Sequence, residues 1–108
     1  MCTNFTPTRH QQWVTDHFGV GLPEHPYLAE AYPGHAAPIA LLGEQGQPQI
    51  KLARFGLIPH WAKDVKAATQ IGRKTYNARS ETVADKPSYR TAWRKRQFAI
   101  ALLDNFFA

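Results

Sequence analysis

The sequence predicts an α+β fold in which short strands and short helices form one domain. Residues 38–43 and 49–56 are apolar runs around a polar, glycine-containing segment, a pattern typical of a β-hairpin with one face in water. Residues 98–103 are continuously apolar, which is typical of a buried strand. Apolar stripes with helical spacing occur over 13–18 and 89–93. A chain of 108 residues is long enough for one domain with a modest core.

The amino-terminal third is expected to combine a strand, a helix and a loop. Residues 2–5 are expected to form a short strand. Thr6 followed by Pro7 predicts the start of a helix, because threonine caps helices and proline suits the first turn. Gly19 suits the end of that helix, since glycine readily adopts the left-handed conformation found there. The prolines and glycines of 19–38 predict a long loop, and such loops are usually functional or pinned by packing.

The segments after the hairpin are expected to be less regular. Residues 57–62 contain a proline that breaks regular structure, and 63–75 are basic and expected to be mobile. Residues 75–79 are expected to form a short strand. A helix capped by Asp85 or Ser88 is expected next. Its aromatic residues are predicted to lie in the core together with an earlier tryptophan; this set is Tyr89, Trp93 and Trp13.

Composition restricts the class of protein. The hydrophobic fraction of 44% is typical of a globular chain. The sequence has no apolar run near the roughly 20 residues that cross a bilayer, and no secretory signal pattern. A single cysteine excludes an internal disulfide framework and favours a reducing, cytoplasmic compartment, near the nucleoid in a bacterial cell.

Charge is segregated along the chain. Residues 1–50 carry one basic side chain, Arg9, against four acidic ones, a balance of −3. Residues 51–96 carry twelve Lys and Arg residues against three acidic ones, a balance of +9. A field of one sign attracts polyanions and raises their association rate. The basic segment is therefore either a nucleic-acid contact surface or a solvated face.

Common catalytic and cofactor motifs are absent from the sequence. Gly43 and Gly46 are not followed by the Gly-Lys-Ser/Thr of a phosphate-binding loop, and there is no Gly-x-Ser-x-Gly elbow. The histidines lack metal-ligand spacing with one another or with the cysteine, so neither a metal nor a cofactor is expected. These histidines are His10, His17, His25, His35 and His60.

Cys2, the single cysteine, directly follows Met1. Its side chain is small enough for methionine aminopeptidases to tolerate, and removal of Met1 would leave a free α-amine beside the thiol. Such a 1,2-aminothiol can capture an aldehyde twice, because the amine forms an imine and the sulfur then closes a five-membered thiazolidine. The second step is intramolecular and gains a large effective molarity. The alternative is a small residue that occupies position 2 by chance.

Three segments together resemble one known family. They are Met1-Cys2, residues 55–62 (FGLIPHWA) and residues 77–82 (NARSET). Two further pieces support them, Ala-Pro at 37–38 and KPSYR at 86–90, and all occur in the right order over essentially the whole chain. On these motifs the sequence is similar to the SOS-response-associated peptidase (SRAP) family.

The resemblance implies a β-rich α+β fold of about twice this length, whose mixed or antiparallel sheet curls into a partial barrel. Residues 1–108 would be the amino-terminal part of such a domain. It also implies a DNA-damage response protein that binds single-stranded DNA and forms a covalent thiazolidine with the aldehyde of an abasic site. The peptidase name refers to self-removal of the initiator methionine, and the cross-linking activity is lyase-like.

The resemblance carries over to particular residues. Cys2 matches the nucleophile. Asn77 matches an active-site asparagine whose amide can hold the amine or the sugar, although its position also suits an ordinary turn. Arg79 matches an arginine suited to a bidentate contact with a phosphate beside the lesion. Glu81 is expected to anchor local structure.

Three more residues are candidates for DNA contacts. Trp61 matches an aromatic near the DNA path that could support a base beside the gap, although it could equally be a core residue. Lys86 and Arg90 are further candidates for phosphate contacts.

The sequence departs from the family pattern in ways that would impair activity. Thr3 and Asn4 replace the usual Gly-Arg, which removes one phosphate contact. Ala108 stands at the position of an active-site glutamate, and the second half that carries the family's catalytic histidine does not follow. The loss of such a general acid or base typically costs about 10²–10⁴-fold in rate. The aromatic end of the chain is expected to be a cut through a larger fold, and retention of Met1 would block the amine.

Two alternatives differ from covalent capture. One is a non-catalytic basic module that binds single-stranded DNA or RNA, with salt-sensitive affinity and no dependence on Cys2. The other is an inactive remnant whose open sheet edge pairs with another chain.

Overall fold

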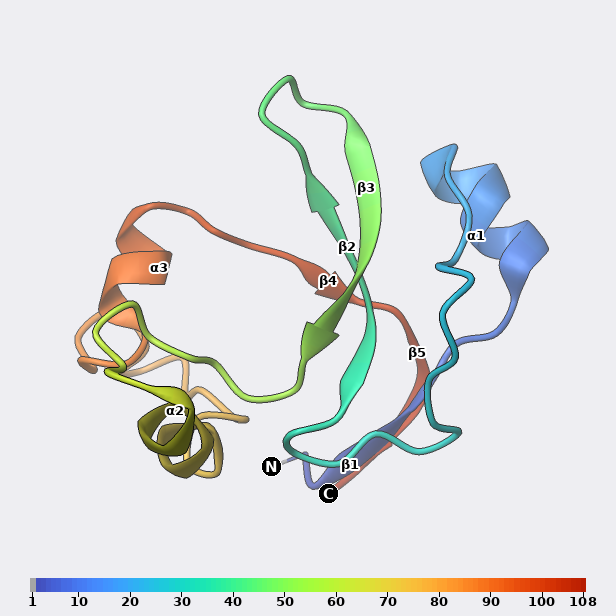
Figure 1. Cartoon of the computed structure of the whole chain (residues 1–108). Helices are drawn as coiled ribbons and strands as arrows, with labels where there is room; N and C mark the ends of the chain where they lie inside the picture. The colour runs from blue at the N-terminus through green and yellow to red at the C-terminus, as the bar shows by residue number, and fades with distance from the viewer. Residues whose placement is uncertain (1) are drawn as a thin grey trace.

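The computed structural model describes residues 2–108, and within them it contains five strands and three helices (Figure 1). Met1, on whose removal the aminothiol chemistry depends, lies outside the described residues. No helix in the described part of the chain is long and apolar enough to cross a membrane. The elements are β1 (Asn4–Pro7), α1 (Gln11–Phe18), β2 (Ala36–Leu42), β3 (Pro48–Arg54), α2 (Val65–Gly72), α3 (Arg90–Arg94), β4 (Ile100–Ala101) and β5 (Leu103–Phe107).

The predicted hairpin is confirmed as β2 and β3. Their antiparallel register runs from Ala36 opposite Arg54 to Leu42 opposite Pro48. Gly46 adopts a positive φ of 80° in the connecting turn, as glycine does readily. β4 pairs with the other edge of β2, which gives a three-stranded sheet of order β3-β2-β4.

The predicted α+β class with antiparallel sheets and short helices is confirmed, but the strands do not close into a barrel. β1 and β5 form a separate two-stranded sheet. The chain passes from one sheet to the other through Leu102, which lies between β4 and β5. In Figure 1, α1 lies on one side of the hairpin, and α2 and α3 lie together on the opposite side.

The first helix starts later than predicted. Thr6 and Pro7 belong to β1, where they pair with β5. The helix α1 begins only at Gln11, and His10 precedes it without a side-chain capping bond. Pairing of β1 with β5 therefore overrides the local helix-start signal. The predicted end is confirmed, since Gly19 has a φ of 76° and caps α1.

The basic segment after the hairpin is also more regular than predicted. Residues 65–72, expected to be mobile, form α2. Asp64 caps this helix, because its carboxylate accepts a hydrogen bond of 2.8 Å from the backbone N–H of Ala67. The short strand expected at 75–79 is wrong, since this segment pairs with no strand and runs as irregular backbone. The break expected at 57–62 is confirmed.

The carboxy-terminal apolar run is only partly buried, contrary to prediction. Leu102 is buried, but the side chains of Phe98 and Ile100 are 57% and 61% exposed. β4, which contains Ile100, is only two residues long and lies at the edge of the three-stranded sheet, so its side chains have a neighbouring strand on one side only. Trp13 and Trp93, predicted to lie in the core, are 52% and 47% exposed. The predicted later helix is α3, without a side-chain cap from Asp85 or Ser88.

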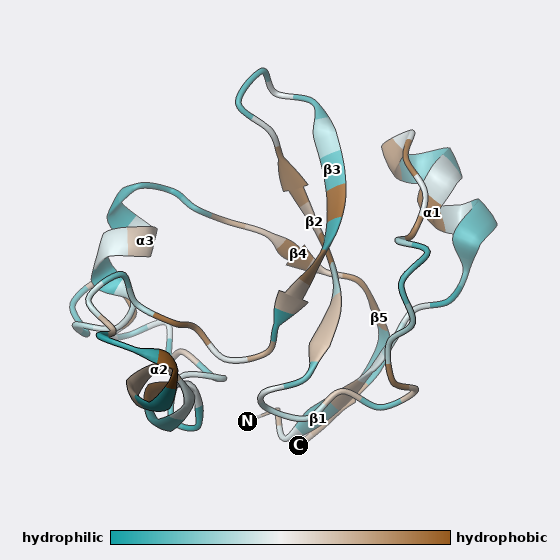
Figure 2. Cartoon of the chain, in the orientation of Figure 1, coloured by the Kyte–Doolittle hydropathy of each residue, from teal (hydrophilic) through white to brown (hydrophobic). Residues whose placement is uncertain are grey.

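Two small clusters form the core. One lies between α1 and the central sheet, and its buried members are Val14, Leu22, Ala40 and Leu102. The other lies under β1, and its buried members are Phe5, Ala31 and Ala37. Figure 2 shows hydrophobic residues on β2 and β4, near the centre of the molecule, and also on α2. Cys2 packs on the edge of the second cluster.

The long loop at 19–35 is pinned to the core. Ala31 and Phe5 exchange two backbone hydrogen bonds, of 3.1 and 2.8 Å, so the loop forms a bridge along the free edge of β1. Nearer α1, the backbone N–H of Leu22 donates to the side-chain amide oxygen of Gln11 at 2.6 Å. The loop therefore fixes the strand that begins just after Cys2.

Replacing Gly56 by alanine is expected to destabilise the fold by about 3 kcal/mol, through backbone strain and overpacking. Gly56 has a φ of 119°, and an added Cβ would lie 2.7 Å from the carbonyl oxygen of Gly72 at the end of α2. Gly46→Ala is a matched control, since Gly46 has a φ of 80° with open space around it, and should cost only about 1 kcal/mol. Urea unfolding measures both, and equal losses would contradict the role of the Gly56–Gly72 contact.

Candidate functional site

Cys2 and Asn77 are 75 residues apart in sequence and are joined by two reciprocal hydrogen bonds. The backbone nitrogen of Cys2 donates to Oδ1 of Asn77 at 3.2 Å. Nδ2 of Asn77 donates to the carbonyl oxygen of Cys2 at 2.7 Å. One side chain therefore holds both polar backbone groups of Cys2, and the nitrogen it contacts is the one that becomes the α-amine when Met1 is absent.

The Cys2 thiol lies at the boundary between the core and the surface. Cys2 is half-buried, and its Sγ donates to the carbonyl oxygen of Asn4 at 3.4 Å. Phe55 and Leu103 are packed against the same buried cluster as Cys2. The sulfur is thus held beside β1 while the residue stays partly accessible.

The segment that carries Asn77 is held in place by two residues that sequence analysis did not assign to the site. Tyr89 donates its phenol hydrogen to the carbonyl oxygen of Asn77 at 2.7 Å. Burial raises the pKa of the Tyr89 phenol above its ordinary value, which keeps it protonated and able to donate. Thr75 is buried and donates to the carbonyl oxygen of Leu57 at 2.6 Å, which ties the segment to the stretch after β3.

A groove of about 370 Å³ opens beside Asn77. Its lining includes three of the other residues that the sequence singles out, Trp61, Arg79 and Lys86, together with Lys74. Trp61 is 47% exposed rather than a core residue, and its indole N–H donates to the carbonyl oxygen of Pro87 at 3.4 Å. An exposed indole face and several cations therefore lie next to the asparagine that holds Cys2.

The charged residues of the site differ in their surroundings. Arg79 forms an exposed ion pair with Glu81, with an N–O distance of 3.4 Å, so the predicted local role of Glu81 corresponds to a contact in the structure. Arg90 is exposed at the start of α3 and does not line the groove. Arg90 nevertheless follows Tyr89, which lines the groove, and its backbone N–H donates to the carbonyl oxygen of Lys86 at 2.9 Å.

Position 108 lies near the Cys2 end of β1. The backbone N–H of Thr3 donates to the carbonyl oxygen of Phe107 at 2.8 Å. Ala108 directly follows Phe107, so its side chain belongs to the same end of the two-stranded sheet as Cys2. A methyl group at this position cannot transfer protons.

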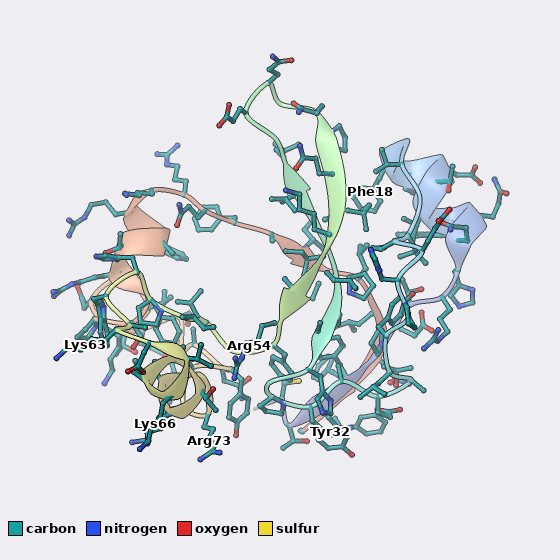
Figure 3. The ribbon with its side chains drawn as sticks, viewed as in Figure 1. Phe18, Tyr32, Arg54, Lys63, Lys66 and Arg73 are labelled. Carbon is teal, nitrogen blue, oxygen red and sulfur yellow. The ribbon has the colours of Figure 1, made fainter. Side chains whose placement is uncertain are left out.

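Basic side chains extend around α2, beyond the groove. Figure 3 shows Lys63, Lys66 and Arg73 on and beside this helix, with Arg54 directed toward it from the end of β3. The Arg54 guanidinium lies beside Gly72, where an added Cβ would be 3.6 Å from its Nε, an ordinary van der Waals contact. The positive balance of residues 51–96 is therefore concentrated on the side of the molecule that carries the groove. Within residues 2–108, no three His, Cys, Asp or Glu side chains are grouped so as to hold a metal ion.

The family model of the SOS response associated peptidase (SRAP) matches residues 1–107. The chain belongs to the SRAP family. Among curated members, abasic site processing protein YoqW of Bacillus subtilis (strain 168) is 35% identical over 97 residues, covering 83% of this chain and 40% of YoqW. Abasic site processing protein YoaM of the same organism is 42% identical over 52 residues, covering 48% of this chain and 21% of YoaM.

A crystal structure of a protein from Bordetella bronchiseptica has the same fold as this SRAP-family chain. The two superpose with a TM-score of 0.81 at 24% identity, over 97% of this chain and 49% of the other. This likeness concerns the fold alone. The chain spans about two fifths of the length of YoqW, and about half of the Bordetella protein.

Proposed function

We propose that this chain captures abasic sites in single-stranded DNA, through a thiazolidine formed by the amine and thiol of Cys2. The observation that carries the proposal is the pair of hydrogen bonds between Cys2 and Asn77, beside a groove that contains cations and an indole. Membership of the SRAP family and the names of the curated relatives, which are abasic site processing proteins, support it.

The proposed reaction starts once the Met1–Cys2 peptide bond has been hydrolysed. The free α-amine adds to the aldehyde carbon of the opened sugar, and loss of one water gives an imine. The thiol then loses its proton and the thiolate adds to the imine carbon. The C–S bond forms as the π electron pair of the C=N bond moves to nitrogen, which takes up a proton. The ring closes with a net release of one water. Oδ1 of Asn77 would hold the amine close to the aldehyde, which favours the intramolecular second step.

The groove provides a physical basis for DNA binding in this proposal. Arg79 would exchange its contact with Glu81 for a phosphate beside the lesion. An exposed ion pair of this kind contributes only about 0–1 kcal/mol to stability. A phosphate that accepts two hydrogen bonds from the guanidinium can therefore replace Glu81. The half-exposed indole of Trp61 would stack on a base next to the gap, and Lys86 would contact a further phosphate.

The experiment compares one oligonucleotide in two chemical states. A single-stranded DNA with one abasic aldehyde is incubated with the chain, whose intact mass has shown that Cys2 is the first residue. A covalent band is expected on a denaturing gel, and no band is expected after borohydride has reduced the aldehyde to an alcohol. Reversible binding of both DNAs should weaken as salt rises. Binding without a band would instead favour the non-catalytic module.

Replacing Ala108 by glutamate is expected to raise the rate of cross-linking. The carboxyl group would lie at the Cys2 end of the β1–β5 sheet, where it could move protons during imine formation. A positioned general acid or base contributes about 10²-fold or more. Single-turnover cross-linking of the wild type, Ala108→Glu and Ala108→Gln measures the effect. Equal rates for Ala108→Glu and Ala108→Gln would contradict proton transfer at this position.

A further inference from the structure

Glu30 binds two side chains of the strand that follows Cys2. Its Oε2 accepts a hydrogen bond from Nδ2 of Asn4 at 3.1 Å, and its Oε1 accepts one from the hydroxyl of Thr6 at 3.0 Å. Asn4 and Thr6 are two residues apart on β1 and therefore face the same side of the strand. Each carboxylate oxygen accepts from a different neutral donor, so the Glu30 side chain bridges Asn4 and Thr6 on one face of β1. We call this pair of contacts the Glu30 clamp.

The backbone beside Glu30 strengthens this arrangement. Ala31, the next residue, exchanges two backbone hydrogen bonds with Phe5, which lies between Asn4 and Thr6. β5 occupies the opposite edge of β1. The strand is thus fixed on one edge by a sheet partner and on the other by the loop that carries Glu30.

Asn4 links the clamp to the reactive residue. Its carbonyl oxygen accepts the hydrogen bond from Sγ of Cys2 at 3.4 Å, and its side-chain Oδ1 accepts one from the hydroxyl of Thr3 at 2.9 Å. The same asparagine gives its Nδ2 to Glu30. A displacement of Asn4 would therefore move the group that orients the thiol.

We propose that Glu30 is a positioning residue for Cys2, acting through Asn4 and Thr6 to hold the aminothiol at the geometry that ring closure needs. This inference rests on the proposed capture of aldehydes. The contact between Glu30 and Asn4 differs from the family pattern, because Asn4 occupies the position where the resemblance places an arginine. Glu30 does not line the groove beside Asn77, so it should affect the covalent step rather than the affinity for DNA.

The test separates the covalent step from binding. Single-turnover cross-linking is measured against the concentration of abasic single-stranded DNA, which gives a maximal rate and a half-saturating concentration. Glu30→Ala removes both side-chain contacts. Thr6→Val leaves only the contact with Asn4. Glu30→Gln can keep both, because its amide oxygen accepts from Asn4 and its amide N–H can donate to the hydroxyl of Thr6. Glu24→Ala, an exposed acidic residue on the same loop, is the matched control for charge. Cooperative thermal unfolding confirms that each variant is folded at the assay temperature.

The expected result is a maximal rate lowered about tenfold in Glu30→Ala, since a displacement of 1 Å can cost up to about 10²-fold. Thr6→Val should lie between this variant and the wild type, Glu30→Gln should stay close to the wild type, and the half-saturating DNA concentration should not change. Glu24→Ala should match the wild type. A wild-type maximal rate in Thr6→Val, or a change confined to DNA affinity, would overturn the inference even if Glu30→Ala fails to fold. A wild-type chain that forms no cross-link would instead refute the proposed function itself.

Discussion

Replacing Cys2 by alanine is expected to abolish covalent capture of abasic DNA while reversible binding is retained. Alanine keeps the α-amine, so an imine can still form, but no sulfur is present to close the ring. The imine is hydrolysed on a denaturing gel, so the band should fall to background. Because Cys2 does not line the groove, binding of the reduced oligonucleotide should stay within about twofold of the wild type.

A reductant provides the internal control for this prediction. Cyanoborohydride converts an imine into a stable amine, so it should restore a band with Cys2→Ala and also with Cys2→Ser. The restored band would show that the amine still reaches the aldehyde and that only the sulfur step is missing. A band of wild-type intensity from Cys2→Ala without reductant would refute thiazolidine formation at this residue.

Replacing Asn77 by alanine is expected to lower the maximal cross-linking rate about 10²-fold, because the amine of Cys2 loses the group that orients it. The same change removes both hydrogen bonds to the half-buried backbone of Cys2, which should reduce the free energy of unfolding by about 2 kcal/mol. Single-turnover kinetics and urea unfolding measure the two effects separately. The kinetics use wild-type and variant protein whose intact mass shows that Cys2 is the first residue, because retained Met1 would block the amine.

Two variants sharpen the Asn77 prediction. Asn77→Asp keeps an oxygen that accepts from the amine but loses the donor to the Cys2 carbonyl, so its rate should lie between those of Asn77→Ala and the wild type. Asn105→Ala, on exposed β5, is the matched control and should change the stability by less than about 0.5 kcal/mol. Wild-type rates in Asn77→Ala would exclude a role for this residue in the covalent step.

Local patterns predicted the elements that depend on neighbouring residues. The hairpin of β2 and β3 follows from two apolar runs and a short turn, and the cap at Gly19 follows from the conformational freedom of glycine. Both depend on contacts within a few residues, which a sequence pattern records directly.

Predictions that depended on distant contacts were wrong. Thr6 and Pro7 carry a helix-start signal, yet they pair with β5, nearly a hundred residues later. The apolar run at 98–103 indicated burial, but its exposure is decided by which elements cover it, and β4 has a partner on only one edge. The mobile segment predicted at 63–75 was wrong for a local reason, because that prediction did not take the cap at Asp64 into account.

Motif resemblance identified the candidate site but not its supports. Cys2 and Asn77 were singled out from their motifs, and the structure joins them by two hydrogen bonds. Tyr89, Thr75 and Glu30 hold these residues in place through contacts 12 to 26 residues apart in sequence. No sequence pattern near these three residues predicts their supporting roles. Each one bonds to a backbone carbonyl or a neutral side chain that only folding brings close.

The sequence by itself determined the family, the hairpin, the segregated positive charge and the presence of a potential aminothiol at position 2, because each is a property of residue type and order. Only the tertiary structure decided that Asn77 meets Cys2, that an indole and several cations lie beside them, and that a loop carboxylate clamps the strand behind the thiol. These features depend on distances between residues far apart in the chain, which are set by how the two sheets and the loop pack together.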